Sequence, residues 1–446
     1  MPKVLMISSD NHAGPNPSEY ASLLEEKYRD GVADLLEQCE IFVKETWPMA
    51  KDPATIAAVD PKNEAPAAVK EGLWDPKRRL ADLDSEGFAA EIIFPGDPAS
   101  IGMYFSNMNR AVSAEYRAAG VRAQNRWLAD FCSNAPDRFL GIGQTEPWPD
   151  MSACIEQIEF AKKSGMIAVN TPRFPGLENN QPPFTDPAWE PFWAACADHD
   201  LPVSIHIGHL HPQGVMFEAM EERNDVETGF PDMAEDGNIF YDPGRRPLWQ
   251  LIMSGVFDRY PSLRVTFSEL RTEWVAPTLA HLEARFDELR FGDEAFALPK
   301  LRPTEYWLRN CAVSHMLKPF EVGLRHQIGV NNMMFSADYP HIEGCWPNTR
   351  EWLRLIFKGV PENEVRLILG ENAARVYNID TAKLQPVVDR IGLDMSEILS
   401  DEPVAREFTD SFDFRSVFFS RPVGYDRSFI DQLMDEDQAA ILTRAR

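Results

Sequence analysis

Acidic and histidine side chains recur at the points where apolar stretches of this sequence end. Asp10 and His12 end the first such stretch, and because they are two residues apart they project to the same side of an extended backbone. His206 ends another stretch, and Asp338 and His341 follow a third. Carboxylates and imidazoles are ligands that proteins offer to divalent transition metals. The residue types and their positions therefore predict a metal site rather than a purely structural polar network.

Two glutamates extend this set. Glu91 lies inside an apolar stretch, where an unpaired carboxylate is costly, so it is either a metal ligand or half of an ion pair with Arg78 or Arg79. Glu269 shares its side of an extended strand with Phe267, so its side chain turns inward only if the backbone twists or bulges there. The candidate metal ligands, enough for two metal ions, are Asp10, His12, Glu91, His206, Glu269, Asp338 and His341.

These positions require a fold that brings the ends of several strands together. Eight short apolar segments have the composition of strands, and segments with helical periodicity lie between them. The predicted strands are Val4–Ser9, Ala89–Phe94, Phe139–Gly143, Met166–Asn170, Leu201–Ile207, Leu263–Ser268, Cys311–Ser314 and Asn332–Ala337. The predicted helices are Arg110–Ser133, Met151–Ser164, Trp189–Asp198, Pro247–Phe257 and Glu273–Leu289.

This alternation is typical of parallel βαβ units in an α/β protein, and eight strands close a (β/α)8 TIM barrel. A doubly wound open sheet shows the same alternation, but no glycine-rich phosphate-binding motif follows the first strand. We therefore expect a TIM barrel, whose catalytic residues lie at the carboxyl ends of its strands.

Two regions fall outside the repeating pattern. Residues 13–80 separate the first two predicted strands, and we expect this largely helical insertion to cap the mouth of the barrel. Residues 381–446 mix helical and irregular segments, and we expect a C-terminal tail that packs on the barrel or on a neighbouring subunit of a homo-oligomer. The metal-dependent barrel domain is thus predicted to span residues 1–380.

Composition excludes several classes of partner. Asp and Glu number 70 against 44 Lys and Arg, which gives a formal net charge of −26. Such an acidic chain is a poor match for nucleic acid, whose phosphates require a basic surface, and for an anionic membrane. No apolar run is long enough to cross a bilayer. The six cysteines are scattered without a CxxC pair, as expected for reduced thiols of a cytoplasmic protein.

Three further residues are candidates for contacts with a small-molecule substrate. Arg173 follows the fourth predicted strand and can pair with a substrate carboxylate, although an ion pair with one of the many acidic side chains is the alternative. His315 ends the seventh strand and either reaches the barrel mouth or serves the structure. His209 lies in the loop after the fifth strand, where it contacts substrate or is an ordinary loop residue.

A set of motifs occurs in a fixed order along the chain: Asp10-x-His12, Arg79-Leu-Ala-Asp-Leu-Asp, Ser-Ile-His206, Phe-Ser-Glu269 followed by Trp274, Ser-Ala-Asp338-Tyr-Pro-His341, and Gly370-Glu-Asn-Ala-Ala-Arg-Val-Tyr. Together they resemble the amidohydrolase superfamily, in the branch that includes aminocarboxymuconate semialdehyde decarboxylase and related metal-dependent decarboxylases. The resemblance implies a metal-bearing TIM barrel with Asp10, His12, His206 and Asp338 at the ligand positions.

The sequence departs from that branch at two places. Glu269 stands where the decarboxylases carry a catalytic histidine, and Asn170 stands where many hydrolytic members carry a lysine that bridges two metals. The chain also shares an Asp-x-His-Ala-Gly opening with a few superfamily members that are non-heme dinuclear monooxygenases. With its carboxylate-rich ligand set, this opening favours an enzyme that holds two divalent transition metals, Fe/Fe or Mn/Fe, and hydroxylates a small organic or acyl substrate with O2 and an electron donor.

The alternative is a hydrolase or decarboxylase with one divalent metal, such as a single Zn. In that mechanism Asp338 is the general base and Glu269 orients water or substrate. A metal-binding scaffold without activity is a third hypothesis, which the intact ligand set disfavours.

Overall fold

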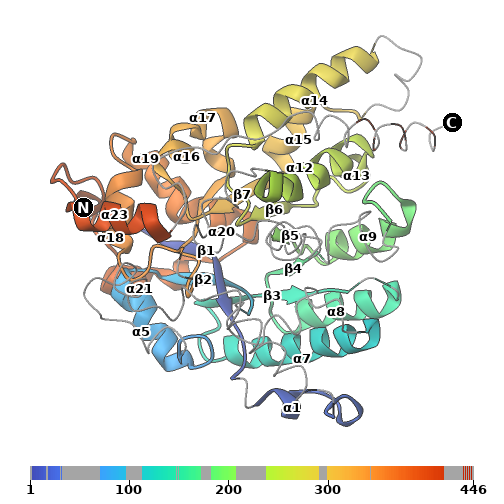
Figure 1. The fold of residues 1–446 in the computed structure, drawn as a ribbon, viewed down its shortest axis with the longest axis horizontal. Coiled ribbons are helices and arrows are strands. Elements are labelled where there is room, and N and C mark those ends of the chain that lie inside the picture. Colours follow the sequence, from blue (N-terminus) through green and yellow to red (C-terminus); the bar gives the residue numbers. More distant parts are fainter. Residues whose placement is uncertain are drawn as a thin grey trace, which may run out of the picture.

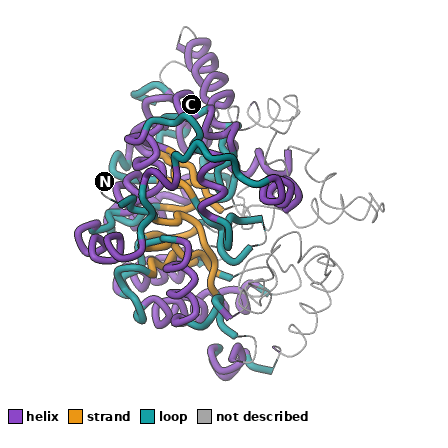
Figure 2. The backbone as a smooth tube through the Cα atoms, turned by 90° about the vertical axis from the view of Figure 1, so that its left-hand side faces the viewer, coloured by secondary structure: helices purple, strands orange, loops and turns teal. Residues whose placement is uncertain are grey.

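The structure is a computed structural model of the 446-residue chain. It describes residues 3–16, 19–30, 32, 71–96, 113–146, 148, 150–171, 182–206, 238–290, 299–341, 343–415, and positions 435, 437, 439, 441 and 443. Figure 1 shows the fold, with strands at its centre and helices around them. The same arrangement is visible from the side in Figure 2, where the orange strands are enclosed by purple helices.

Eight strands form one parallel sheet in which each strand pairs with the next along the chain. They are β1 (Ile7–Ala13), β2 (Ala90–Pro95), β3 (Phe139–Gln144), β4 (Ala168–Asn170), β5 (Val203–His206), β6 (Val265–Ser268), β7 (Cys311–His315) and β8 (Met333–Phe335). The segment after β8 returns to β1, because the Asp338 amide donates to the Asp10 carbonyl at 3.0 Å and the His12 amide donates to the Tyr339 carbonyl at 2.7 Å. The predicted (β/α)8 TIM barrel is confirmed.

Helices connect the strands and cover the outside of the barrel. The longer ones are α5 (Pro76–Glu86), α7 (Ala114–Cys132), α8 (Met151–Lys163), α9 (Glu190–Asp198), α12 (Asn238–Met253), α14 (Val275–Arg290), α15 (Pro303–Asn310) and α18 (Thr349–Ile356). Shorter ones are α13 (Val256–Arg259), α16 (Pro319–Gly323), α17 (Arg325–Ile328), α19 (Glu362–Arg366) and α20 (Asn372–Tyr377). The predicted helices agree with these to within a few residues, except that the predicted Pro247–Phe257 segment divides between α12 and α13.

The barrel interior changes from apolar to polar along the strands. Side chains such as Ile92, Ile142, Ala168 and Met334 form a buried apolar cluster in its lower part. Polar residues replace them towards the carboxyl ends, where Ser204 and its neighbours on β6 are fully buried. An apolar floor therefore excludes water from below, and the polar upper part is where chemistry can take place.

The described part of the insertion after β1 packs beside the barrel. Its short helices are α1 (Tyr20–Leu23) and a 3-10 turn at Glu26–Tyr28. Tyr20 and Tyr28 pack on Ala119 and Ala123 of α7. Helix α5, which leads into β2, already begins at Pro76, where Asp75 caps it by accepting hydrogen bonds from the Lys77 and Arg78 amides. The predicted cap over the barrel mouth falls mainly on residues 33–70, which lie outside the described residues.

The C-terminal region packs on the amino-terminal end of the barrel and on its outer helices. Its helices are α21 (Thr381–Ile391), α22 (Met395–Ile398) and α23 (Arg406–Arg415). The Val4 amide donates to the Leu393 carbonyl at 2.9 Å, and Phe412 packs on Trp352 of α18 with ring centroids 4.9 Å apart. These contacts show how α21–α23 pack on their own barrel, whereas the predicted boundary at residue 380 and the contact with a second subunit stay predictions.

Two smaller predictions concern cysteines and membranes. Cys132, Cys154, Cys196, Cys311 and Cys345 are all unbonded thiols, as expected. Within the part of the chain that the structure describes, no helix combines the length and the apolar composition needed to cross a membrane.

Candidate metal centre

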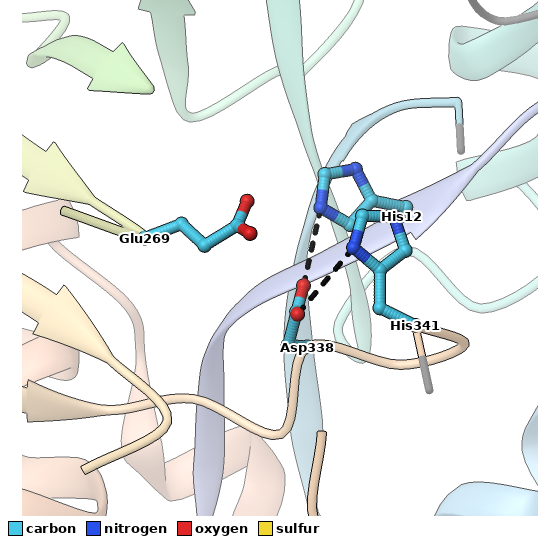
Figure 3. A group of neighbouring side chains, drawn as sticks. All are labelled: His12, Glu269, Asp338 and His341. Carbon is cyan, nitrogen blue, oxygen red and sulfur yellow. Dashed lines mark ion pairs between the residues drawn. The ribbon is translucent and has the colours of Figure 1, made fainter. Parts of the chain in front are cut away.

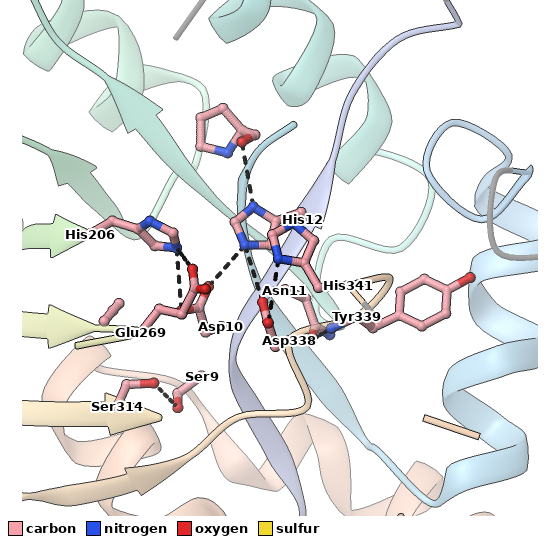
Figure 4. A network of polar contacts seen from close by, with 12 residues as sticks. Ser9, Asp10, Asn11, His12, His206, Glu269, Ser314, Asp338, Tyr339 and His341 are labelled. Atoms are coloured by element: carbon pink, nitrogen blue, oxygen red, sulfur yellow. Dashed lines mark hydrogen bonds and ion pairs between the residues drawn. The ribbon is translucent and has the colours of Figure 1, made fainter. Parts of the chain in front are cut away.

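Six of the seven predicted ligands converge at the carboxyl end of the barrel. Figure 4 shows these residues, which we call the ligand cluster: Asp10, His12, His206, Glu269, Asp338 and His341. His12 and Asp10 come from β1 and His206 from the end of β5, while Glu269, Asp338 and His341 follow β6 and β8. Because each strand of the barrel ends at the same rim, residues that are hundreds of positions apart in sequence become neighbours.

Short distances link the members of the ligand cluster. Nε2 of His12 lies 3.3 Å from Oδ1 of Asp338, and Nδ1 of His341 lies 3.4 Å from Oδ2 of the same carboxylate. The rings of His12 and His341 stack in parallel with centroids 4.3 Å apart. On the other side, Nε2 of His206 lies 3.4 Å from Oδ2 of Asp10 and 3.3 Å from Oε2 of Glu269. Asp338 therefore joins the two stacked imidazoles, and His206 joins two carboxylates.

Unusual backbone conformations direct the side chains of Glu269 and Asp338 toward the ligand cluster. Glu269 has a φ of 57° and Asp338 a φ of 54°, in the left-handed region that residues other than glycine seldom occupy. This twist at Glu269 is what its sequence position requires for an inward side chain. Figure 3 shows the Glu269 side chain pointing from the end of β6 toward His12 and Asp338. Non-glycine residues in this region carry a conformational cost, and such residues are concentrated at functional sites.

The ligand cluster fits a divalent cation. Its donor atoms form two overlapping groups, each within 4.8 Å: Asp10, His12 and His206, and His12, Glu269, Asp338 and His341. Both oxygens of Asp10 and both oxygens of Asp338 are buried and accept no hydrogen bond from any described residue. Their neighbours are imidazole nitrogens of His12, His206 and His341 at 3.3–3.7 Å, and buried carboxylates that face imidazoles in this way form an environment suited to a cation. Mixed imidazole and carboxylate donors are suited to a divalent transition metal.

Electrostatics of the ligand cluster support the same conclusion. Burial raises the pKa of Asp10 to about 8 and raises the pKa of Glu269 well above its usual range, with the Asp338 carboxylate adding to both shifts. Burial lowers the pKa of His206 to about 3. Burial alone would also raise the pKa of Asp338, but His341 holds that pKa well below its usual range. A cation placed among these groups would stabilise the ionised carboxylates and the neutral imidazoles.

Glu91, the seventh predicted ligand, does not belong to the ligand cluster. Its two oxygens accept hydrogen bonds from Nε and Nη2 of Arg79 at 2.8 and 2.7 Å, and Oε2 also accepts one from Asn11 at 2.5 Å. Both members of the ion pair are completely buried. The interpretation of Glu91 as a metal ligand is therefore corrected in favour of the ion-pair alternative, because its charge and its lone pairs are already used within the protein.

The Glu91 ion pair nevertheless supports the ligand cluster from behind. Asn11 lies between the ligands Asp10 and His12, and its side-chain oxygen accepts a hydrogen bond from the Tyr339 amide at 2.9 Å. Arg79 donates to the His12 carbonyl at 2.7 Å and lies under the Tyr339 ring. The Tyr339 ring points away from the cluster (Figure 4). Sequence reasoning missed Asn11, although its place between two ligands was a signal.

The three residues predicted to contact a substrate are His315, Arg173 and His209. His315 is buried, and its Nδ1 lies 3.0 Å from Oε2 of Glu321, which also accepts a hydrogen bond from the Lys318 amide. This contact holds His315 to α16 and gives it a structural partner. Arg173 and His209 lie outside the described residues, so their predicted contacts with substrate stay predictions.

Comparison with known proteins identifies the family. The family model for amidohydrolases (Amidohydro_2) matches residues 59–379, which is more than half of the chain. The chain therefore belongs to this amidohydrolase family, and the resemblance inferred from the ordered motifs is confirmed. Gamma-resorcylate decarboxylase from Rhodococcus jostii strain RHA1 is 25% identical to it over 293 residues, which cover 61% of this chain and 80% of that protein.

Solved structures share the fold at lower sequence identity. An amidohydrolase from Mycobacterium avium subsp. paratuberculosis K-10 has a TM-score of 0.60 at 19% identity, over 84% of this chain and 99% of that chain. A 2,6-dihydroxybenzoate decarboxylase in complex with 2,6-dihydroxybenzoate has a TM-score of 0.58 at 17% identity, over the same shares. A dihydroxybenzoic acid decarboxylase from Polaromonas sp. JS666, with bound manganese and the inhibitor 2-nitroresorcinol, has a TM-score of 0.57 at 16% identity, over 85% and 99%.

These relatives bear on the choice between oxygenase and decarboxylase. They are decarboxylases and an amidohydrolase, and they give the predicted monooxygenase and its iron pair no support. The loss of Glu91 from the ligand set also removes one of the four carboxylates on which the dinuclear hypothesis depended. The alternative of a metal-dependent decarboxylase or hydrolase agrees better with both observations.

Proposed function

We propose that this protein is a metal-dependent decarboxylase that removes CO2 from a hydroxylated aromatic acid without oxidation. The observation that carries the proposal is the ligand cluster, whose carboxylates and imidazoles lie close enough together to hold a cation. Its relatives supply the substrate class, because the Rhodococcus relative is named for gamma-resorcylate and a structural neighbour is bound to 2,6-dihydroxybenzoate. Membership of the amidohydrolase family supports a metal-dependent reaction.

In this proposal Asp10, His12, His206 and Asp338 hold one divalent cation. Manganese is the first choice, since the Polaromonas relative contains it. A single ion is favoured because the two groups of donors share His12, and one imidazole nitrogen coordinates one metal. Asn170 also stands where a lysine would bridge two metals in many hydrolytic members. When bound, the cation supplies Lewis-acid chemistry by polarising the oxygens of the substrate.

The side chains around the cation have separate tasks in this reaction. Decarboxylation breaks the bond between the ring and the carboxylate, leaves the electron pair on the ring carbon, and requires that carbon to gain one proton. Glu269 extends from β6 toward the cluster and is the carboxyl group in place to deliver that proton and recover it from water. Asp338 keeps His12 and His341 in their stacked orientation through its two contacts at 3.3 and 3.4 Å. The Glu269 side chain is 14% exposed and can exchange its proton with water, whereas His12 and Asp338 are buried away from solvent.

The test is turnover by protein reconstituted with metal. Protein stripped with a chelator and reloaded with Mn2+ should release CO2 from 2,6-dihydroxybenzoate and yield resorcinol in equal amounts, and the stripped protein should not. Asp338→Asn should lose the activity together with tight Mn2+ binding. Glu364→Gln, which weakens an ion pair with Arg325 on the outer helices, is the matched control and should keep both.

A different product would overturn the proposal. If the Mn2+-loaded protein converts no member of a panel of hydroxybenzoates, hydroxynaphthoates and carboxylated methoxyphenols, the decarboxylase assignment is wrong. Hydrolysis of amides or lactones without CO2 release would instead establish the hydrolytic branch of the family.

A further inference from the structure

Two buried carboxamide side chains stand next to each other at the carboxyl ends of β3 and β4. The strands pair Gln144 with Asn170, so the two residues lie at the same level of the barrel. Only 3% of Gln144 and 1% of Asn170 is exposed. Nε2 of Gln144 and both Nδ2 and Oδ1 of Asn170 have no hydrogen-bond partner among the described residues. Buried amide groups without hydrogen-bond partners destabilise the fold unless a ligand or an ordered water forms hydrogen bonds with them.

Both carboxamides project into the barrel. Side chains two positions apart share a side of a strand, and Ile142 and Ala168, which precede them by two, belong to the apolar interior. The intervening position on β3 faces outward, because a Cβ added to Gly143 would lie 2.8 Å from the Cβ of Ala161 on α8. Gln144 and Asn170 therefore rise from the apolar floor toward the mouth.

The backbone groups of the two residues form hydrogen bonds, whereas their side-chain amides have no partner among the described residues. Asn125 of α7 accepts a hydrogen bond from the Gln144 amide at 2.8 Å and donates one to the Gln144 carbonyl at 3.0 Å. The Thr145 hydroxyl donates to the Asn170 carbonyl at 2.6 Å. With their peptide groups satisfied, the two residues present their carboxamides from fixed positions. This is the arrangement of a preorganised binding site.

The pair lies within reach of the ligand cluster. Asn170 is paired with Ser204 on β5, and His206 follows two residues further toward the mouth. With ~4.8 Å between strands and ~3.3 Å per residue along them, the Cα atoms of Asn170 and His206 are about 8 Å apart. An aromatic ring with substituents on two sides spans such a distance.

We propose that Gln144 and Asn170 form a subsite for a hydroxyl group of the substrate. A hydroxyl both donates and accepts, so it can donate to Oδ1 of Asn170 while it accepts from Nε2 of Gln144. The pair carries no charge, which makes it a poorer partner for a carboxylate than a cationic site. The substrate carboxylate with one neighbouring oxygen then lies at the ligand cluster, and a second ring hydroxyl lies at the carboxamides. This inference rests on the proposed function and refines it, since it selects dihydroxylated over monohydroxylated aromatic acids.

Binding of unreactive analogues tests the subsite without turnover. Affinities of 2-nitroresorcinol and 2-nitrophenol, which differ by one hydroxyl, are measured by calorimetry on the full-length Mn2+-loaded protein. We expect 2-nitroresorcinol to bind about tenfold more tightly, because 2-nitrophenol lacks the hydroxyl that would form hydrogen bonds with Gln144 and Asn170. Asn170→Leu, which has a similar shape but no polar atoms, should reduce this ratio to less than threefold. Its affinity for Mn2+ should be unchanged.

Gln144→Met is a second variant that keeps the proposal testable if Asn170→Leu does not fold, and it should also lower the ratio. An unchanged ratio in the folded variants would overturn the subsite. Failure of 2-nitroresorcinol to bind the wild type would overturn it as well. The two proposals fail separately. Release of CO2 with no change of ratio in the variants refutes only the subsite, whereas a ratio that depends on Asn170 without any CO2 release refutes only the decarboxylase.

Discussion

Glu91→Gln separates the two interpretations of the buried glutamate most sharply. The substitution keeps the size of the side chain but removes the negative charge that faces Arg79. It also places an NH2 group opposite a hydrogen-bond donor, because both oxygens of Glu91 accept from Arg79 and one also accepts from Asn11. Arg79 and Glu91 are both fully buried, so the guanidinium would be left without a counter-charge. Breaking a buried ion pair in this way costs about 3–5 kcal/mol of the free energy of unfolding.

This cost converts to a change in melting temperature. At about 2.1 cal/mol/K per residue, cooperative unfolding of the 446-residue chain has an entropy of roughly 0.9 kcal/mol/K, so Tm should fall by about 3–5 °C. The same change loosens Asn11 and the His12 carbonyl behind the ligand cluster. Residues that support metal ligands typically contribute 10–100-fold to affinity, so the Kd for Mn2+ should rise by about tenfold or more.

The assay combines calorimetric unfolding of the metal-free protein with Mn2+ titration at 25 °C. At saturating Mn2+ the variant should still bind the same number of ions per chain as the wild type. Glu364→Gln provides the comparison, since it weakens the Arg325 ion pair and should lower Tm slightly with no change in Kd. Loss of a bound ion at saturation, without a drop in Tm, would show that Glu91 is a ligand and that the ion-pair reasoning is wrong.

Three further predictions concern other parts of the molecule. Glu269→Ala should keep most of the Mn2+ affinity but slow CO2 release by about 100-fold or more in steady-state kinetics, because the variant lacks the general acid. Unchanged turnover would show that Glu269 takes no part in the mechanism. Burial raises the pKa of Asp10 from its ordinary value of 3.8 to about 8, so the folded metal-free protein keeps an extra proton between these values. The contribution of Asp10 to stability should therefore fall as pH rises from about 4 to about 8, and Mn2+ should oppose this fall, which thermal unfolding of the wild type and of Asp10→Asn at both pH values can measure. Asp437 accepts hydrogen bonds from Arg246, Trp249 and Gln250 of α12. Asp437→Asn should therefore lower the free energy of unfolding, measured in urea, by about 3–5 kcal/mol. A smaller loss would mean that this contact does not hold the C-terminal region to the barrel.

Strand periodicity predicted the fold because each barrel strand carries its own local signal. All eight predicted strands overlap the observed ones, since buried parallel strands are short apolar runs that differ clearly from the helices between them. The first strand was placed too early, at Val4–Ser9 instead of Ile7–Ala13. Its polar carboxyl half is buried by the ligand cluster and its partners, so apolar composition could not indicate that the strand continues through Asp10 and His12.

The ligand cluster was predictable in type and only partly in membership. Histidines and aspartates at strand ends stand out against the apolar residues before them, and six of the seven predicted ligands do meet. Glu91 has the same appearance in sequence, and only the position of Arg79 across the turn from α5 to β2 shows that its charge is already paired. Gln144 gave no signal of its own, because neutral amides are ordinary at strand ends, and Asn170 stood out only because it replaces a lysine of many hydrolytic members.

The sequence by itself therefore determined the class of the protein: a parallel barrel, a cluster of imidazoles and carboxylates at its rim, and membership of the amidohydrolase superfamily. These properties follow from residue types and local spacing. The tertiary structure decided which carboxylates face the imidazoles of the ligand cluster and which one is paired with an arginine, namely Asp10 and Asp338 on one side and Glu91 on the other. Pairing depends on distances between side chains that are far apart along the chain, and a strand pattern fixes only the side on which each residue lies.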